Sequence, residues 1–309
     1  METAGKGPMR NSSVPRRYLV GLIGEGISVS LTPAMHEAES AELGLDYVYR
    51  VHDLLELGRR PDEIGELLRE LRAAGYSAAN ITHPCKQLVL DVVDALEPDA
   101  ARLRAVNLVV FEPDRTVGYN TDWMGYREGL AAGLPGASLE RVVQIGCGGA
   151  GAATAYAVLS AGAVRLELSD ADDARAAELA ERMRVLFPDR RITTVDTERV
   201  PAAIARASGV IHATPVGMAH HPGIAFDPAL LAPGAWVSDV VYRPLETELV
   251  RLSLAHGHPV LDGGRMAVGQ ACASLRIITG VEPDRERMHR HFRALVSAEE
   301  RAARGGSAE

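Results

Sequence analysis

The chain has 309 residues, of which 47% are hydrophobic, and its 41 acidic residues outnumber 33 basic ones for a net charge of −8. That length suffices for about two domains with separate hydrophobic cores. An acidic chain without a basic block disfavours binding to nucleic acid or an anionic membrane, and no run of about 18 apolar residues predicts a membrane span.

In the first half, apolar strand-like runs alternate with segments of helical period. Strands are predicted at 18–23, 46–51 and 77–81, with helices after Pro33, from Pro61 to Gly75 and from Pro84 to about 96. Two short strands at 107–111 and 116–119 flank the turn signal Glu-Pro-Asp-Arg and predict a hairpin. A helix follows over about 121–132.

The second half continues this alternation. Strands are predicted at 141–145, 164–168, 192–195, 209–213, 235–241 and 259–261, and helices at 152–162, about 172–186, 265–279 and 283–298. Strands that alternate with helices predict an α/β fold class with mostly parallel sheets. Polar, aperiodic segments at 1–16 and 303–309 are expected to be flexible tails.

A glycine-rich turn lies between the strand at 141–145 and the following helix. Gly146, Gly148 and Gly151 form GxGxxG, with Gly149 and Ala150 inside the motif. In dinucleotide-binding folds these glycines allow a tight turn, close approach of the pyrophosphate and close helix packing. The alternative is a merely tight strand–helix turn.

An acid at the end of the next strand favours the dinucleotide interpretation. Asp170 follows Gly151 by 19 residues, where a carboxylate accepts the adenosine ribose hydroxyls. A 2′-phosphate would meet Asp170, Asp172 and Asp173 with no base immediately after the strand, which favours NAD over NADP. Arg175 is expected to border the adenine.

Only Lys6 and Lys86 among the basic residues are lysines. Codon bias explains the arginines, and a solvated lysine is the ordinary interpretation of Lys86. At a predicted helix start in a partly dry cleft, however, a lysine exchanges protons, whereas arginine stays charged. Asp122 lies at another predicted helix start. Taken by itself, it is interpreted as an acid that interacts with the helix dipole.

Several motifs, taken together in chain order, favour a functional role for Lys86 and Asp122 over these ordinary interpretations. They are Ser30-Leu-Thr32-Pro-Ala-Met-His36, Asn80-Ile-Thr82-His-Pro-Cys-Lys86, Ala105-Val-Asn107, Asn120-Thr-Asp122, Ala213-Thr214-Pro215-Val216-Gly-Met, Asp239-Val240-Val-Tyr242-Arg-Pro and Gly263-Gly-Arg-Met-Ala267-Val-Gly-Gln270. The ordered set, from about Tyr18 to Arg293, resembles the shikimate/quinate dehydrogenase family.

The resemblance implies a site and a division into domains. It implies Lys86 and Asp122 as catalytic residues, and as substrate contacts Ser30, Thr32, Thr82, Asn107, Tyr242 and Gln270. It adds Thr214, Pro215, Val216, Val240 and Gly263 to the cofactor contacts. It implies a substrate-binding and catalytic domain at 17–121, completed by helices at about 265–302, and a Rossmann NAD-binding domain at 122–264, with a cleft between them.

Three departures from the family pattern point to its NAD-linked quinate/shikimate branch: Thr32, Ala267 and the pair Asp170-Ala171. The expected reaction is reversible, NAD-dependent oxidation of quinate or shikimate to the 3-dehydro acid. The alternatives are an NADP-linked biosynthetic shikimate dehydrogenase, an enzyme for amino-substituted relatives of these acids, and a non-catalytic NAD- or metabolite-binding regulatory protein.

The remaining expectations are negative or general. Three scattered cysteines without a CxxC pair or secretory signal favour a reducing cytoplasm. Cys85 is interpreted as an apolar filler beside Lys86 rather than a nucleophile. The histidines lack ligand spacing, so no metal site is expected. We expect a small-molecule substrate and a monomer or homodimer.

Overall fold

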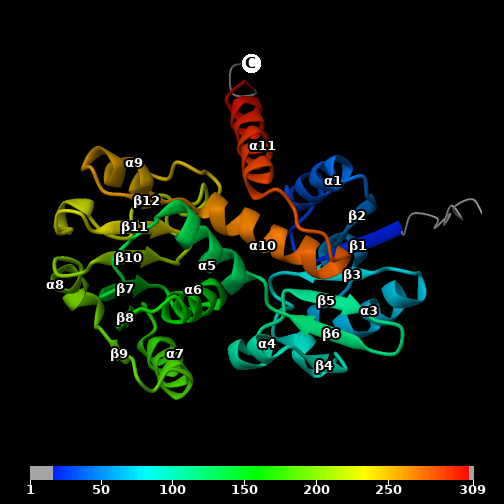
Figure 1. The fold of residues 1–309 in the computed structure, drawn as a ribbon, viewed down its shortest axis with the longest axis horizontal. Coiled ribbons are helices and arrows are strands. Elements are labelled where there is room, and N and C mark those ends of the chain that lie inside the picture. Colours follow the sequence, from blue (N-terminus) through cyan, green and yellow to red (C-terminus); the bar gives the residue numbers. More distant parts are fainter. Residues whose placement is uncertain (1–16, 306–309) are drawn as a thin grey trace, which may run out of the picture.

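The computed structural model describes residues 17–305 and contains two six-stranded sheets (Figure 1). The segments expected as tails, 1–16 and most of 303–309, lie outside the described residues, but the last helix continues through 303–305. No helix of the described residues is long and apolar enough to cross a membrane.

The first sheet has the strand order β2-β1-β3-β5-β6-β4. Its strands are β1 (Arg17–Gly24), β2 (Asp46–Asp53), β3 (Ala78–Ile81), β4 (Ala95–Leu96), β5 (Leu108–Phe111) and β6 (Thr116–Tyr119). β1 pairs in parallel with β2 and β3, whereas β5 and β6 form the predicted antiparallel hairpin. Its helices are α1 (Thr32–Glu42), α2 (Leu54–Leu57), α3 (Ile64–Ala73) and α4 (Pro98–Leu103).

The second sheet is parallel throughout, with the order β12-β11-β10-β7-β8-β9. Its strands are β7 (Arg141–Ile145), β8 (Arg165–Ser169), β9 (Arg191–Thr194), β10 (Gly209–His212), β11 (Trp236–Asp239) and β12 (Val260–Leu261). Between them run α6 (Gly149–Ser160), α7 (Asp173–Leu186), α8 (Val200–Ile204) and α9 (Glu248–Ala255). The strand order reverses between β7 and β10, the point where open α/β sheets bind ligands.

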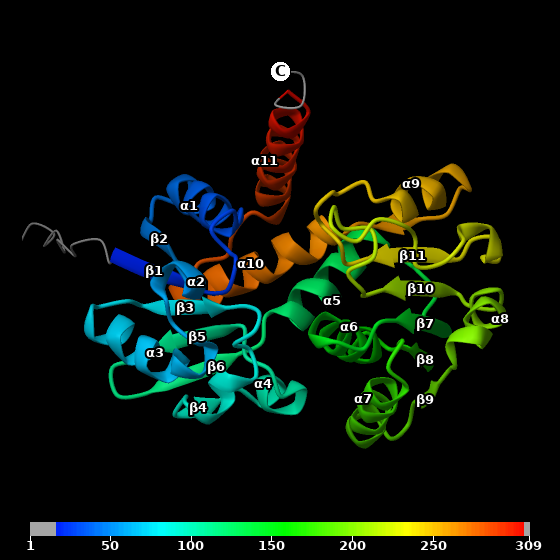
Figure 2. The same cartoon turned by 180° about the vertical axis from the view of Figure 1, so that it is seen from behind.

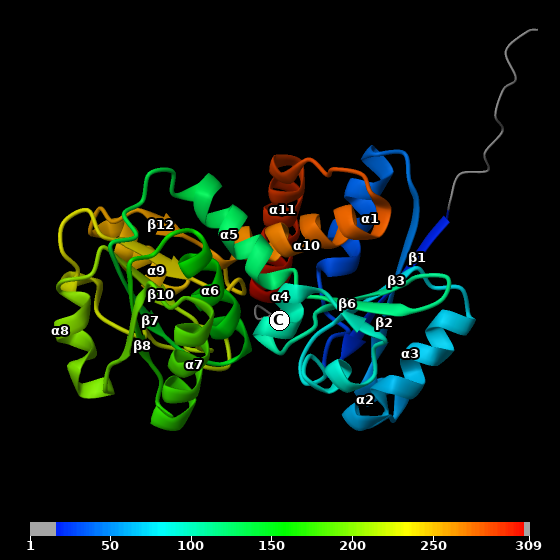
Figure 3. The ribbon, with the colours of Figure 1, turned by 60° about the horizontal axis from the view of Figure 1, so that its bottom comes forward.

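Two helices lie between the sheets. α5 (Asp122–Gly133) and α10 (Gly263–Thr279) run side by side in the middle of the molecule (Figures 1 and 2). Glycines allow this close approach, because a Cβ on Gly125 would lie 2.2 Å from the backbone nitrogen of Gln270. α11 (Arg285–Gly305) then packs against α10 and α1 (Figure 3) and projects from the rest of the molecule (Figures 1 and 2).

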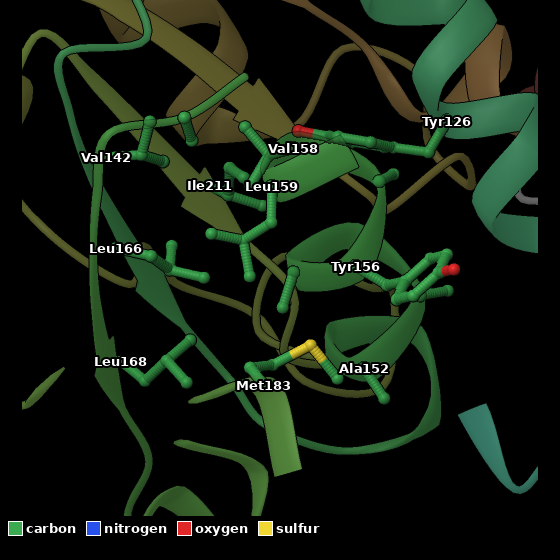
Figure 4. Close-up of a cluster of buried hydrophobic side chains, with 14 of the residues drawn as sticks. Tyr126, Val142, Ala152, Tyr156, Val158, Leu159, Leu166, Leu168, Met183 and Ile211 are labelled. Carbon is green, nitrogen blue, oxygen red and sulfur yellow. The ribbon is translucent and has the colours of Figure 1, made fainter. Parts of the chain in front are cut away.

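The largest core cluster surrounds α6 and includes side chains of α5 (Figure 4). Side chains of β7, β8 and β10 pack against the apolar face of α6 and against Met183 of α7. Its members include Val142, Leu166, Leu168, Ile211, Ala152, Tyr156, Val158 and Leu159. This packing holds the beginning of α6 at the end of β7, where the glycine turn lies.

The prediction of a helix from Pro84 to about 96 is wrong. That segment forms a turn, a short 3₁₀ helix at Leu88–Asp91 and then β4. The Lys86 carbonyl accepts a hydrogen bond from the distant Val106 N–H at 2.9 Å, which removes it from any helical ladder. Lys86 therefore does not lie in the first turn of an α-helix.

Other differences are smaller. The short helices α2, α4, α8 and α9 were not predicted, and each spans eight residues or fewer. The strand predicted at 235–241 ends at Asp239, and the last helix is longer than predicted. The α/β class with mostly parallel sheets is confirmed.

Candidate active site

A cavity of about 290 Å³ brings together residues from both halves of the chain. Of the predicted site residues, it is lined by Ser30, Thr32, Thr82, Lys86, Asn107, Asp122, Ala150, Val240, Tyr242, Gly263 and Gln270. These residues come from loops after β1, β3 and β11, from the segment before β5, from the first turns of α1, α5 and α6, and from α10. The cavity thus lies between the two sheets, beside α5 and α10.

Lys86 and Asp122 form an ion pair in this cavity. Lys86 Nζ lies 2.6 Å from Asp122 Oδ2, and the two side chains are 30% and 12% exposed. Asp122 is the first residue of α5, as predicted. An ammonium group has three donors, so Lys86 retains others for a group bound in the cavity.

Asn107 fixes the second oxygen of that carboxylate. Its Nδ2 donates to Asp122 Oδ1 at 2.8 Å and to Thr121 Oγ1 at 2.9 Å, while its Oδ1 accepts the Thr121 N–H at 2.6 Å. Both amide hydrogens of Asn107 are thus used within the protein. A new contact to its Nδ2 requires one of these bonds to be exchanged.

Asn80 and Ser274, which were not predicted, extend this network. Asn80 Nδ2 donates to Ser274 Oγ at 3.1 Å, and Ser274 Oγ lies 3.1 Å from Thr121 Oγ1. Tyr49 donates to Asn80 Oδ1 at 2.8 Å. Two sequence signals were available: Asn80 begins the lysine motif, and Ser274 follows Gln270 by one helical turn on α10.

The mouth of the cavity is formed by the loops at Ser30 and Tyr242. Ser30 Oγ accepts the Thr32 N–H at 3.3 Å, which places both hydroxyl residues at the start of α1. Arg243, which was also not predicted, lines the cavity and donates to the Val29 carbonyl at 3.0 Å. This contact joins the loop after β11 to the loop before α1.

Cys85 lies beside Lys86 but is not suited to act as a nucleophile. Its side chain is buried, and burial, with a smaller contribution from Glu25, raises the pKa of the thiol to about 11. The thiol therefore stays protonated at neutral pH, and only a thiolate is strongly nucleophilic.

The glycine turn suits a pyrophosphate. A Cβ on Gly151 would lie 2.2 Å from the Gly146 carbonyl oxygen, and Gly146 has a φ of +103°, so this turn requires glycine at both positions. In contrast, a Cβ on Gly148 or Gly149 would meet no atom within 4 Å. No side chain caps α6, so no side-chain acceptor occupies its first N–H groups, as an anion site requires.

Asp170 follows β8 directly and lies under this turn. It is 9% exposed, and its carboxylate accepts the backbone N–H groups of Cys147 at 2.7 Å and Asp172 at 2.9 Å. Arg175 Nη1 lies 3.4 Å from Asp170 Oδ1. Gly148, Gly149 and Arg175 line a second cavity of about 220 Å³ beside the turn.

The remaining predicted cofactor residues lie next to this turn or line the first cavity together with Ala150. The loop Thr214–Val216 follows β10, and Thr214 Cγ2 would lie 2.9 Å from a Cβ on Gly146. Val240 and Gly263 contact each other's backbone closely, because a Cβ on Gly263 would lie 2.5 Å from the Val240 carbonyl oxygen. Within residues 17–305, no cluster of three or more His, Cys, Asp or Glu side chains could hold a metal ion.

A glycine turn at the switch point of a parallel sheet, facing a lysine–carboxylate pair, defines an oxidoreductase that uses a nicotinamide dinucleotide. Comparison with known families agrees. The model of the shikimate dehydrogenase substrate binding domain matches residues 22–109. The shikimate dehydrogenase (NADP⁺) of Pseudarthrobacter chlorophenolicus is 56% identical over 93% of this chain and 98% of its own length.

A relative with the other cofactor also matches over nearly its full length. The quinate/shikimate dehydrogenase (NAD⁺) of Corynebacterium efficiens is 48% identical over 90% of this chain and 98% of its own. Among solved structures, quinate dehydrogenase from Corynebacterium glutamicum in complex with NAD aligns with a TM-score of 0.85 and 43% identity, covering 90% of this chain and 99% of that one. The chain belongs to the shikimate/quinate dehydrogenase family.

Proposed function

We propose that this dehydrogenase oxidises one ring hydroxyl of quinate or shikimate reversibly, with NAD as its cofactor. The observation that carries the proposal is the Lys86–Asp122 pair at 2.6 Å, which faces a cavity bordered by Ala150 of the glycine turn. A lysine held by a carboxylate is suited to move a proton to and from a hydroxyl group. The nicotinamide, when bound, accepts or returns the hydride.

Lys86 takes the hydroxyl proton during oxidation and returns it to the carbonyl oxygen during reduction. Asp122 orients Lys86 beside the reacting hydroxyl, whose single proton passes to Lys86. Asn107 holds Asp122 in place, because it donates to the oxygen that Lys86 leaves unused. A proton acceptor fixed in this way contributes to rate through both proton transfer and orientation.

The other predicted residues bind the substrate. Ser30, Thr32 and Tyr242 hold the ring carboxylate, while Thr82, Asn107 and Gln270 contact ring hydroxyls. Their support is that all six line one cavity with the lysine–carboxylate pair. The cofactor is held by the glycine turn, Asp170, Arg175, Thr214–Val216, Val240 and Gly263. We also retain the domain division at 17–121 with 265–302, and 122–264, as a prediction.

The choice of NAD rests on Asp170. Its carboxylate is fixed by two backbone donors at the end of β8, where an adenosine ribose is bound in this fold. A 2′-phosphate there would meet the charges of Asp170 and Asp172, with the side chain of Arg175 already shared between both. The second candidate is an NADP-linked shikimate dehydrogenase, which the 56% identical relative favours by its name.

Initial rates with NAD and NADP, each paired with quinate and with shikimate, separate these candidates. We expect reduction of NAD with at least one of the two acids. A higher kcat/KM with NADP would overturn the cofactor assignment. Absence of turnover with all four pairs, in a protein that still binds NADH, would favour the non-catalytic alternative.

A further inference from the structure

Three polar side chains, those of Thr214, His212 and Asp239, are joined in a row by hydrogen bonds where β10 and β11 end. His212 Nδ1 lies 3.0 Å from Asp239 Oδ1, and His212 Nε2 lies 2.5 Å from Thr214 Oγ1. His212 and Asp239 are each 1% exposed. This order of hydroxyl, imidazole and carboxylate has no part in the proton transfer proposed above, and burying it requires that its polar groups be satisfied.

The carboxylate sets the direction of these hydrogen bonds. A carboxylate only accepts, so Nδ1 of His212 carries the hydrogen that faces Asp239. In the neutral imidazole Nε2 then accepts from the hydroxyl of Thr214. Thr214 Oγ1 in turn accepts the Val216 N–H at 3.3 Å. The Thr214 hydroxyl therefore closes the turn at Thr214–Val216 by accepting the Val216 N–H, and its own hydrogen is held by His212 Nε2.

Asp239 connects the same histidine to a second loop. It accepts the Val241 N–H at 3.0 Å and the Thr247 hydroxyl at 2.6 Å. The neighbours of Val241, Val240 and Tyr242, line the cavity that holds Lys86. Thr247 also caps α9, because its hydroxyl oxygen accepts the Val250 N–H. One carboxylate thus ties the loop after β11 to both β10 and α9.

The loop at Thr214 borders the glycine turn directly. A Cβ on Gly146 would lie 2.5 Å from the Ala213 carbonyl oxygen and 2.9 Å from Thr214 Cγ2. A small shift of this loop would therefore close or open the space beside the turn. His212 bonds the side chain of Thr214, and the Ala213 N–H donates to the Ile145 carbonyl at 2.7 Å, so the contacts of His212 contribute to the position of the loop.

We propose that His212 is a positioning residue that, through Asp239, sets the Thr214–Val216 loop and the Val240–Tyr242 loop relative to each other. Cofactor affinity and substrate position then depend on one buried contact. The inference rests on the proposed function, because it takes Thr214–Val216 as cofactor contacts and Tyr242 as a substrate contact.

The test compares His212→Leu, His212→Asn and Thr214→Val with Ser253→Ala as the matched control. Ser253 is fully buried, but its hydroxyl only donates to the Leu249 carbonyl within α9. For each variant, NADH binding to the protein without substrate is measured by fluorescence titration, together with KM for cofactor and acid, kcat and the melting temperature.

We expect His212→Leu to raise both the Kd for NADH and the KM for the acid by about 10-fold, as loss of a buried hydrogen bond implies. His212→Asn, whose amide can donate to Asp239, should restore the KM for the acid and leave a rise in Kd of a few-fold. Thr214→Val should affect only the cofactor, and its effect should not add to that of His212→Leu.

Two results would overturn the inference. One is His212→Leu with unchanged Kd and KM values. The other is a loss of melting temperature alone, matching the control, which would make the contact merely structural. Long-range ¹⁵N NMR of His212 gives an independent readout, and a spectrum with the hydrogen on Nε2 would contradict the assigned hydrogen bonds. Because NADH binding and NMR need no turnover, they separate this inference from a failure of the proposed function.

Discussion

Asp170→Asn tests the cofactor assignment most directly. The substitution keeps the shape of a side chain that is 9% exposed and removes its charge, and it also loses one of two backbone hydrogen bonds, because Asn has a single acceptor oxygen. A phosphate about 5 Å from the carboxylate is repelled by about 3 kcal/mol per pair of unit charges at an effective dielectric constant near 20. Arg175, at 3.4 Å and half exposed, offsets part of this repulsion. A net penalty of about 2 kcal/mol corresponds to about 30-fold in binding.

The carboxylate also accepts the ribose hydroxyls, so its replacement should weaken NAD. We expect kcat/KM for NAD to fall about tenfold and that for NADP to rise, which shifts their ratio by about 10²-fold. Steady-state rates with both cofactors measure the ratio, and Asp189→Asn is the control for the same change of charge at an exposed position. A wild-type enzyme that prefers NADP, or an unchanged ratio in Asp170→Asn, would refute the reasoning.

Three further predictions test the site and the fold. Lys86→Met should lower kcat by about 10²–10⁴-fold without changing the Kd for NADH, and Lys86→Arg should not rescue it, because arginine stays protonated; near-normal turnover would show that another group moves the proton. Gly151→Ala should lower the melting temperature, since its Cβ would lie 2.2 Å from a carbonyl oxygen, whereas Gly149→Ala, with open space, should fold normally and bind NADH weakly; the reverse order of melting temperatures would contradict the packing argument. Burial lowers the pKa of His36 from 6.5 to about 3. Below pH 6.5 the unfolded chain therefore binds a proton that the folded chain does not bind. As the pH is lowered from 6.5 to 3, the free energy of unfolding should fall by up to about 1.4 kcal/mol per pH unit. In urea denaturation at several pH values, His36→Gln should flatten this slope, and equal slopes would contradict it.

Local sequence patterns predicted the parts of the fold that local physics decides. The alternation of apolar strands and helices predicted the α/β class, and GxGxxG after a strand predicted the turn at Gly146–Gly151. Glycine is required there by the positive φ of Gly146 and by the steric conflict between Gly151 and Gly146, which are local and which a short motif records. Asp170 was placed for the same reason, because it directly follows a clear strand.

The helix predicted at 84–96 shows where local patterns mislead. Pro84 and the apolar residues after Lys86 fit a helix start, but the Lys86 carbonyl is bonded to Val106 instead. That partner is 20 residues away and becomes available only when β5 and β6 pair next to β3. Tertiary hydrogen bonds therefore overrode the local preference of this segment.

The sequence by itself determined the motifs and, through a family resemblance, which residues to expect in the site. Only the tertiary structure decided that Lys86 meets Asp122, that Asn80 meets Ser274 across 194 positions, and that His212 joins Thr214 to Asp239. The physical reason is that turns and helix starts depend on neighbouring residues. A hydrogen bond between distant side chains instead depends on how two sheets and the helices between them pack.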